Sequence, residues 1–244
     1  MSIDVLGGPD RRTPGDIRKQ VADIEREYAA LIELSVEESV LYDLAKVKVC
    51  DDFAHTNLFG SDAKVYVKAA SVHDALCSAA DAYAGDHFLL LMPVDCMHIG
   101  ESYLAGKDSV EYDICAYSTT YPILKQATRF NQLAYPTHVF LARNASFNAG
   151  RYELCADVLA IPRGTKETFA GTLLKKILGI AKEYNVDALI FDPFDWGVSC
   201  KDPSKFISVV RKVLQDSESG ISRIYCSVKD QKLLELSSKE FRNF

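Results

Sequence analysis

The sequence lacks clustered metal ligands: it has no C-x-x-C pair, and its five histidines are scattered. A structural zinc site needs cysteines or histidines grouped at short spacing. Seven cysteines, an odd number that falls mostly in apolar runs, are typical of buried thiols in a reducing compartment. The composition therefore predicts an intracellular protein without a zinc centre or a disulfide framework. The seven cysteines are Cys50, Cys77, Cys96, Cys115, Cys155, Cys200 and Cys226, and the five histidines are His55, His73, His87, His98 and His138.

The chain also lacks a basic excess and any long hydrophobic run. Its formal net charge is -6 and its pI is near 5.4, which argues against a nucleic-acid surface. No apolar run reaches the roughly 18 residues of a membrane-spanning helix, and the first residues do not resemble a signal peptide. We therefore expect a soluble cytoplasmic protein, with the nucleus as a second compartment, no membrane partner and no cofactor.

The order of helical and apolar segments predicts an α/β fold. Residues 1–14 are expected to form a mobile arm, and residues 15–244 a single domain. An amphipathic helix is expected from Gly15 to Glu38 and a buried strand from Phe88 to Val94. Further strands are expected at 47–49, 64–69, 137–143, 152–161, 188–191 and 221–228, and further helices at 71–85, 108–119, 165–184 and 203–214. Alternation of this kind is typical of a mixed sheet with helices on both faces.

Two loops stand at the carboxyl ends of predicted strands, where ligands of such sheets bind. The first follows Val94 and the second follows Phe191. The second loop, Asp192 to Asp202, leads into a helix that begins at Pro203, an arrangement that often holds a phosphate. Yet the loop carries Asp192 and Asp195, whose negative charge opposes phosphate binding.

Three segments carry a resemblance to a known family. They are Tyr121-Pro-Ile-Leu124, the helix and strand from Leu173 to Ile190, and Trp196-Gly-Val-Ser-Cys-Lys-Asp-Pro203. In order and spacing the chain resembles the compact microbial-type branch of the macrodomain-type poly(ADP-ribose) glycohydrolases, from about Val47 to Val228. The resemblance implies a three-layer, macrodomain-like mixed sheet flanked by helices, here with an N-terminal helical extension.

The positions that carry function in this family are altered in this chain. Counting back from Tyr121 places the Gln-Glu-Glu motif on Val110, Glu111 and Tyr112. The family's second glutamate is its acid/base carboxylate, so a tyrosine stands where that group is expected. The family's asparagine at a strand end corresponds to Met92. Its first glycine triplet corresponds to Gly100, Glu101 and Ser102. Its second glycine triplet corresponds to Asp192, Asp195 and Gly197.

These departures predict a degenerate pocket. Tyrosine, with an ordinary pKa near 10, is a poor substitute for a carboxylic acid/base. A carboxylate about 5 Å from a phosphate charge costs about 3 kcal/mol at an effective dielectric near 20. We therefore expect a catalytically inactive or repurposed macrodomain-like protein that acts as an interaction or structural module through a protein partner or self-association. The alternative is binding or hydrolysis of ADP-ribose or a related nucleotide by shifted residues, with Glu111 as the catalytic group.

Each candidate residue also has a plainer interpretation. Glu111, Tyr112 and Asp113 could form a catalytic cluster, but a solvated first helical turn is favoured. Trp196 could stack on a base, but an anchoring aromatic residue is favoured. Asp192 and Asp195 are favoured as turn residues, and a divalent-cation site made by Asp95, Glu101, Asp192 and Asp195 is the minor alternative.

The remaining candidates are nucleophiles and a base. Cys115 and Cys200 could act as nucleophiles, but buried, unreactive thiols are favoured. His98 could act as a general base in the first loop, but an ordinary surface histidine is favoured.

Overall fold

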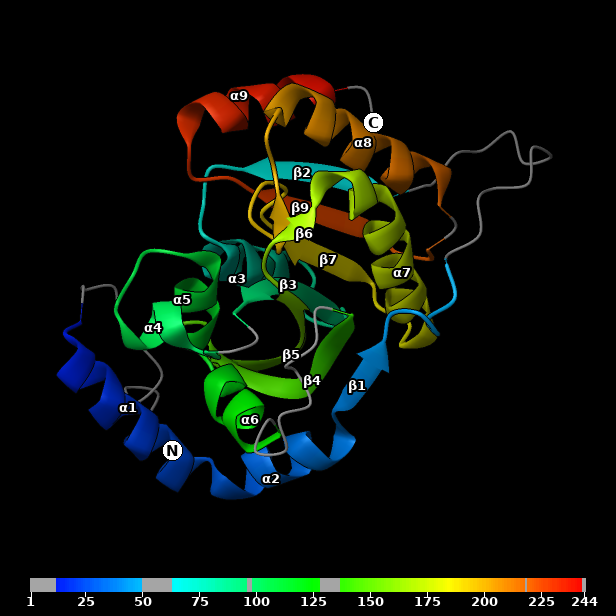
Figure 1. The fold of residues 1–244 in the computed structure, drawn as a ribbon. Coiled ribbons are helices and arrows are strands. Elements are labelled where there is room, and N and C mark those ends of the chain that lie inside the picture. Colours follow the sequence, from blue (N-terminus) through cyan, green and yellow to red (C-terminus); the bar gives the residue numbers. More distant parts are fainter. Residues whose placement is uncertain (1–11, 50–62, 96–97, 128–136, 218, 243–244) are drawn as a thin grey trace. The chain divides into compact units, whose positions relative to one another are not determined.

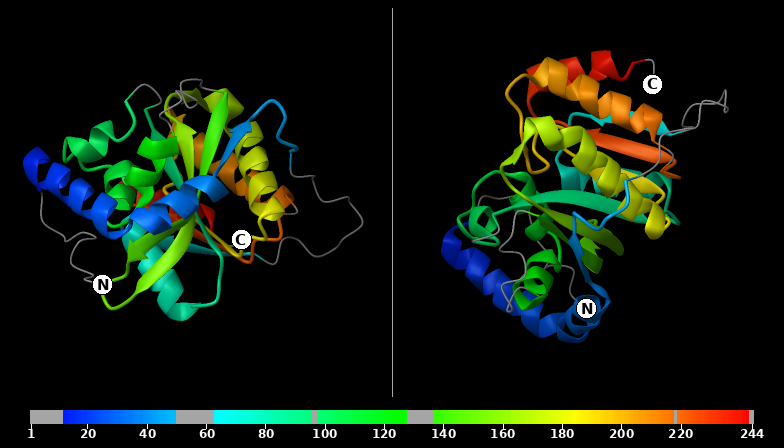
Figure 2. Two further views of the ribbon diagram at one scale, coloured as in Figure 1. Left: turned by 90° about the horizontal axis from the view of Figure 1, so that it is seen from below. Right: turned by 45° about the vertical axis from the view of Figure 1, so that its right-hand side comes forward.

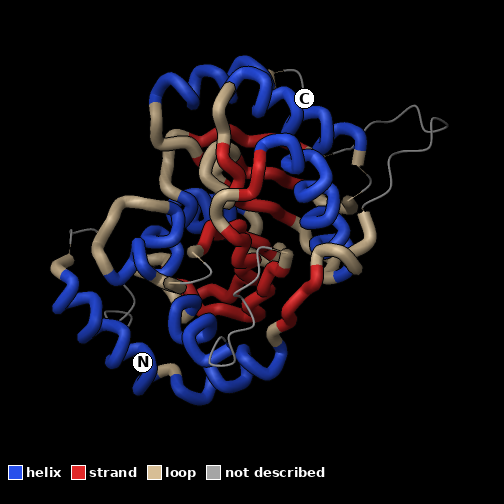
Figure 3. The backbone as a smooth tube through the Cα atoms, viewed as in Figure 1, coloured by secondary structure: helices blue, strands red, loops and turns tan. Residues whose placement is uncertain are grey.

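The computed structural model describes residues 12–49, 63–95, 98–127, 137–217 and 219–242 (Figure 1). Most of the expected arm, residues 1–11, together with Cys50, His55 and Cys96, lies outside these ranges. The chain divides into two compact units, Met1–Tyr42 with Leu90–Arg163 and Asp43–Leu89 with Gly164–Phe244. Within the described ranges seven strands form one mixed sheet flanked by helices, which confirms the predicted fold class (Figure 3), and two further strands form a separate small sheet.

The first unit contributes the strands β1-β4-β5-β3 in that order. β4 and β5 form an antiparallel pair, and α2 and α6 pack against β4. β3 is buried along its whole length, as its continuous apolar sequence predicts. The elements are α1 (Pro14–Glu27), α2 (Ala29–Glu38), β1 (Val40–Asp43), β3 (Phe88–Val94), α4 (Glu101–Leu104), α5 (Val110–Cys115), α6 (Thr120–Ala127), β4 (His138–Asn148) and β5 (Glu153–Pro162).

The second unit contributes β7-β9-β2, all parallel, with α3 against β7 and β9 and α9 against β2. Helices α8 and α9 lie side by side (Figure 2). The elements are β2 (Lys64–Lys68), α3 (Val72–Ala82), β6 (Thr165–Lys166), the 3-10 turn η3 (Glu167–Phe169), α7 (Ala170–Glu183), β7 (Ala188–Phe191), β8 (Val198–Ser199), α8 (Pro203–Asp216), β9 (Arg223–Ser227) and α9 (Gln231–Glu240).

Several element boundaries differ from the sequence prediction. The single helix expected over 15–38 breaks at Tyr28, whose buried side chain reaches across the unit and donates to Glu153 at 2.5 Å. The expected strand at 47–49 is wrong: the strand is β1, and residues 47–49 are irregular. The helix expected over 108–119 ends at Cys115, and α6 begins at Thr120.

Candidate functional site

Glu111 lies in the first turn of α5 and is buried, with 1% of its surface exposed. Its Oε1 accepts the backbone N–H of Gly100 at 3.0 Å, and its Oε2 accepts that of Ser102 at 3.0 Å. The favoured interpretation of Glu111 as part of a solvated first turn is therefore wrong. The carboxylate fixes the first loop to the start of α5, and both its oxygens are engaged by the protein itself.

Arg163 is the charged neighbour of this carboxylate. Its Nη2 lies 4.0 Å from Oε2 of Glu111, and its Nη1 donates to the Oγ of Ser102 at 3.1 Å. Burial raises the pKa of Glu111, against the lowering effects of Arg163 and the two backbone N–H groups. The sequence analysis missed Arg163, although its place directly after β5 could have signalled it, since side chains at strand ends line such sites.

Gly100, the glycine that survives in the first loop, is required by packing. It caps α4 at a φ of 79°, and a Cβ built on it would lie 2.2 Å from Cε2 of Tyr121. Glycine adopts a positive φ without steric cost and leaves room for the ring. This packing accounts for the glycine without any need for a phosphate.

Tyr112 follows Glu111 and is only partly buried. Its ring centroid lies 6.0 Å from that of Tyr103, which in turn lies 5.5 Å from that of Tyr121. Burial is the main cause that raises the pKa of Tyr103 and Tyr121 above the ordinary tyrosine value. These two neighbouring phenols therefore hold their protons at neutral pH.

The two cysteines considered as nucleophiles have raised pKa values. Cys115 is buried, its Sγ lies 3.8 Å from Sδ of Met92, and burial raises its pKa well above the usual thiol value. Burial is also the main cause that raises the pKa of Cys200, followed by Glu167 and Asp202. A thiol with a raised pKa forms little nucleophilic thiolate at neutral pH. Cys115 is buried as expected, whereas Cys200 is only partly buried.

In the second unit, the side chain of Asp192 accepts a hydrogen bond from the backbone of its own loop. Its Oδ1 accepts the backbone N–H of Phe194 at 2.8 Å, and its carbonyl accepts that of Asp195 at 3.2 Å. Burial raises the pKa of Asp192 to about 6. Asp192 therefore has the turn role that the sequence Asp-Pro favoured, and Asp195 joins the same turn through its backbone N–H. Gly197 has a φ of 103°, and its carbonyl accepts the N–H of Thr165 at 3.1 Å.

Trp196 is a core residue, with 0% of its surface exposed. Its Nε1 donates to the carbonyl of Pro193 at 3.1 Å, and its ring packs against Phe191 and Phe206. A fully buried indole offers no face to a nucleotide base. The favoured interpretation, a residue that anchors the loop, agrees with this geometry.

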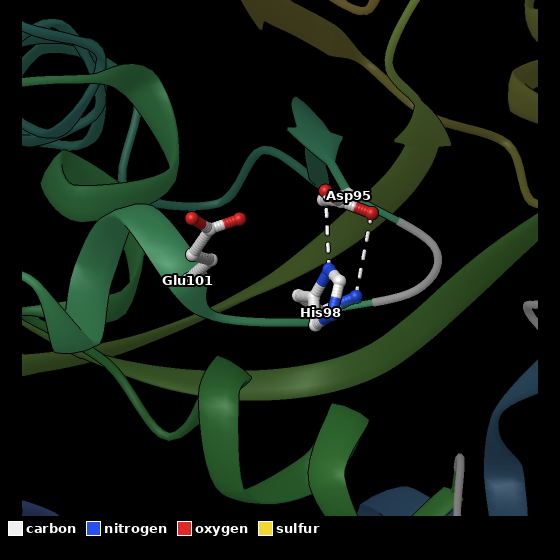
Figure 4. Close-up of side chains that lie close together, drawn as sticks. All are labelled: Asp95, His98 and Glu101. Carbon is white, nitrogen blue, oxygen red and sulfur yellow. Dashed lines mark hydrogen bonds and ion pairs between the residues drawn. The ribbon is translucent and has the colours of Figure 1, made fainter.

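Asp95, His98 and Glu101 lie close together in the first loop (Figure 4). Oδ2 of Asp95 lies 3.6 Å from Nδ1 of His98, and one potential metal-ligand atom of each residue lies within 4.8 Å of the other two. Figure 4 shows Asp95 after β3, Glu101 at the start of α4, and His98 between them along the chain. The four-carboxylate site with Asp192 and Asp195 would join residues of both units and stays a prediction.

No family model matches the chain, and no curated protein matches its sequence. Its structure is similar to the poly(ADP-ribose) glycohydrolase of Thermomonospora curvata, with a TM-score of 0.70 and 15% identity over 93% of this chain and 98% of that one. The chain has the fold of a poly(ADP-ribose) glycohydrolase. The Deinococcus radiodurans enzyme in complex with ADP-ribose matches with a TM-score of 0.66 and 13% identity, over 86% of this chain and 97% of that one.

The fold resemblance expected from the sequence is thus confirmed. At this level of identity the likeness concerns the fold alone. No helix in the described part of the chain is long and apolar enough to cross a bilayer.

Proposed function

We propose that this chain is a macrodomain-like protein that does not hydrolyse ADP-ribose linkages and that acts as an interaction or structural module, through a protein partner or self-association. The observation that carries the proposal is that Glu111 is buried and hydrogen-bonded to the protein backbone. It is the carboxylate at the family's motif, and both its oxygens accept backbone N–H groups of the first loop.

Glycosidic cleavage needs a carboxyl group that can approach the leaving oxygen and transfer a proton. Glu111 has 1% of its surface exposed and would have to release Gly100 and Ser102 before it could do so. Release would leave two N–H groups without their acceptor, at a cost of about 1–3 kcal/mol each. Tyr112, at the position of the family's second glutamate, has no carboxyl group to replace it.

The second loop supports the same conclusion. In the family this loop offers backbone N–H groups to a diphosphate, whereas here the carboxyl group of Asp192 accepts the N–H of Phe194. An anion would therefore have to compete with a side chain of the chain itself. The indole of Trp196 is fully buried and offers no surface on which a base could stack.

An intracellular location is part of the proposal. Its support is that the five cysteines in the described ranges, Cys77, Cys115, Cys155, Cys200 and Cys226, are all free thiols. Free thiols of this number are typical of reducing compartments.

The decisive experiment is incubation of the chain with poly(ADP-ribosyl)ated protein and measurement of the ADP-ribose released. We expect no release above the buffer rate. Release that is abolished by Glu111→Gln but kept by Glu101→Gln, which changes an exposed carboxylate at the start of α4, would overturn the proposal. Circular dichroism of both variants shows whether the fold is retained.

Binding without hydrolysis is the second candidate function, because the fold is that of enzymes solved in complex with ADP-ribose. Calorimetric titration with ADP-ribose distinguishes a nucleotide-binding protein from an interaction module that binds no nucleotide. We expect no heat of binding at millimolar ligand, and a dissociation constant below about 10 µM would favour a nucleotide-binding protein instead. In that case Asp192→Gly should tighten binding, since it removes the carboxyl group that competes for the loop.

A further inference from the structure

The cluster Asp95, His98 and Glu101 offers one imidazole nitrogen and two carboxylates within seven consecutive residues. The three residues are spaced at i, i+3 and i+6, after the end of β3 and into the start of α4. One nitrogen and two oxygen ligands suit borderline divalent ions such as Zn²⁺. Neither the glycohydrolase fold nor the proposed function requires these three side chains.

The distances fit an ion after a small adjustment. Two ligands bound to Zn²⁺ at about 2.1 Å in a tetrahedral shell lie about 3.4 Å apart. Asp95 Oδ2 and His98 Nδ1 are already 3.6 Å apart, and the potential ligand atoms of all three residues lie within 4.8 Å of one another. The side chain of Glu101 is 53% exposed and has room to close the remaining gap.

The backbone next to Asp95 and Glu101 is held in place by groups outside the cluster. Asp95 follows a strand that is buried throughout, and the carbonyl of Val94 accepts the N–H of Arg163 at 2.8 Å. Glu101 stands between Gly100 and Ser102, whose N–H groups are both bound to Glu111. A backbone fixed in advance lowers the entropic cost of closing three ligands around an ion.

The local charges also favour a cation. Asp95 and Glu101 bring two negative charges to the cluster, and Lys107 is a positive neighbour, with Nζ 3.8 Å from Oε1 of Glu101. Lys107 and Glu101 are both more than half exposed, and exposed pairs of this kind contribute little to stability. A divalent ion can therefore displace the lysine at small cost.

We propose that Asp95, His98 and Glu101 bind one Zn²⁺ ion, or a similar first-row divalent ion, on the outer side of the first loop. Three protein ligands leave the fourth tetrahedral position open to water or to an anion from solution. The site is independent of the proposed loss of hydrolysis, so either idea can fail without the other.

The test is titration of the chelator-treated full chain with Zn²⁺ in competition with a coloured chelator. Cys96 lies next to Asp95 in sequence, so the titration uses a Cys96→Ser background to exclude its thiol. Co²⁺ absorption then reports the ligand type, because a thiolate adds a strong charge-transfer band that imidazole and carboxylate lack. We expect one equivalent of metal, bound with a dissociation constant of about 10 µM or lower and without the thiolate band.

Single-ligand variants assign the site. His98→Ala and Glu101→Gln should each weaken binding by about tenfold or more, since each removes a direct ligand. His138→Ala, which removes a histidine of β4, should leave the affinity unchanged. His98 has a 71% exposed side chain, so its removal is compatible with an intact fold. Absence of binding up to millimolar Zn²⁺, or binding unchanged in His98→Ala, would overturn the proposal.

Discussion

Replacing Asp192 by asparagine tests the electrostatic argument for the second loop. Burial raises the pKa of this carboxyl group from 3.8 to about 6. Each pKa unit of difference between the folded and unfolded states corresponds to about 1.4 kcal/mol. The shift of about two units therefore makes ionised Asp192 cost the fold about 2–3 kcal/mol.

The pH dependence has a definite sign. Between pH 3.8 and about 6 the folded state binds the Asp192 proton more tightly than the unfolded state, so stability falls as the pH rises through this window. Asparagine does not titrate, and its Oδ1 can still accept the N–H of Phe194. Asp192→Asn should therefore gain about 2–3 kcal/mol relative to the wild type between pH 4 and pH 7.5.

The assay is urea unfolding at several pH values, followed by the fluorescence of Trp196, the single tryptophan, which lies in the same unit. Asp192→Ala is the matched control, because it also abolishes titration but loses the hydrogen bond to Phe194. It should show the same pH-dependent gain, displaced by about 1 kcal/mol towards lower stability. If the difference in free energy of unfolding between the wild type and Asp192→Asn stays constant from pH 4 to pH 7.5, the reasoning is refuted. If the wild type instead gains stability relative to Asp192→Asn as the pH rises, the loop N–H groups stabilise the ionised carboxylate of Asp192 more than burial destabilises it.

Three further substitutions test the packing and the ion pairs by thermal or urea unfolding. Glu111→Ala should lower stability by about 2–6 kcal/mol, because it removes the acceptor of two buried N–H groups; a loss below about 1 kcal/mol would contradict the assigned role. Gly100→Ala should also destabilise the fold, because the new Cβ meets the ring of Tyr121 at 2.2 Å, and the additional change Tyr121→Ala should recover part of the loss. Arg223→Ala should cost about 1–3 kcal/mol, because it removes the partly buried ion pair with Asp86; a similar loss in Asp86→Ala and a non-additive double variant would show that the pair acts as a unit.

Local signals in the sequence predicted much of the secondary structure correctly. Ser71 begins α3 because its hydroxyl accepts the N–H of Asp74, and Asp202 begins α8 in the same way. The apolar run at β3 predicted a strand covered on both faces. Such signals succeed because caps and periodic patterns act between residues close in sequence.

Predictions that depended on distant residues were less secure. The hydroxyl of Tyr28, at the break between α1 and α2, donates to Glu153, which is 125 positions away. The place of Arg163 beside Ser102 joins residues 61 positions apart. No local pattern encodes such pairs, because they exist only once the strands and helices have packed.

The sequence by itself determined the α/β class and the place of both candidate loops, since these depend on residue order and spacing. Only the tertiary structure decided what the remaining groups do. Glu111 on α5 could face solvent, a ligand or the protein, and the first loop packs its Gly100 and Ser102 N–H groups against it. Trp196 could likewise have been exposed, but Phe191 and Phe206 enclose it. The physical reason is that burial and hydrogen-bond partners are set by contacts between separate elements, which composition and periodicity do not specify.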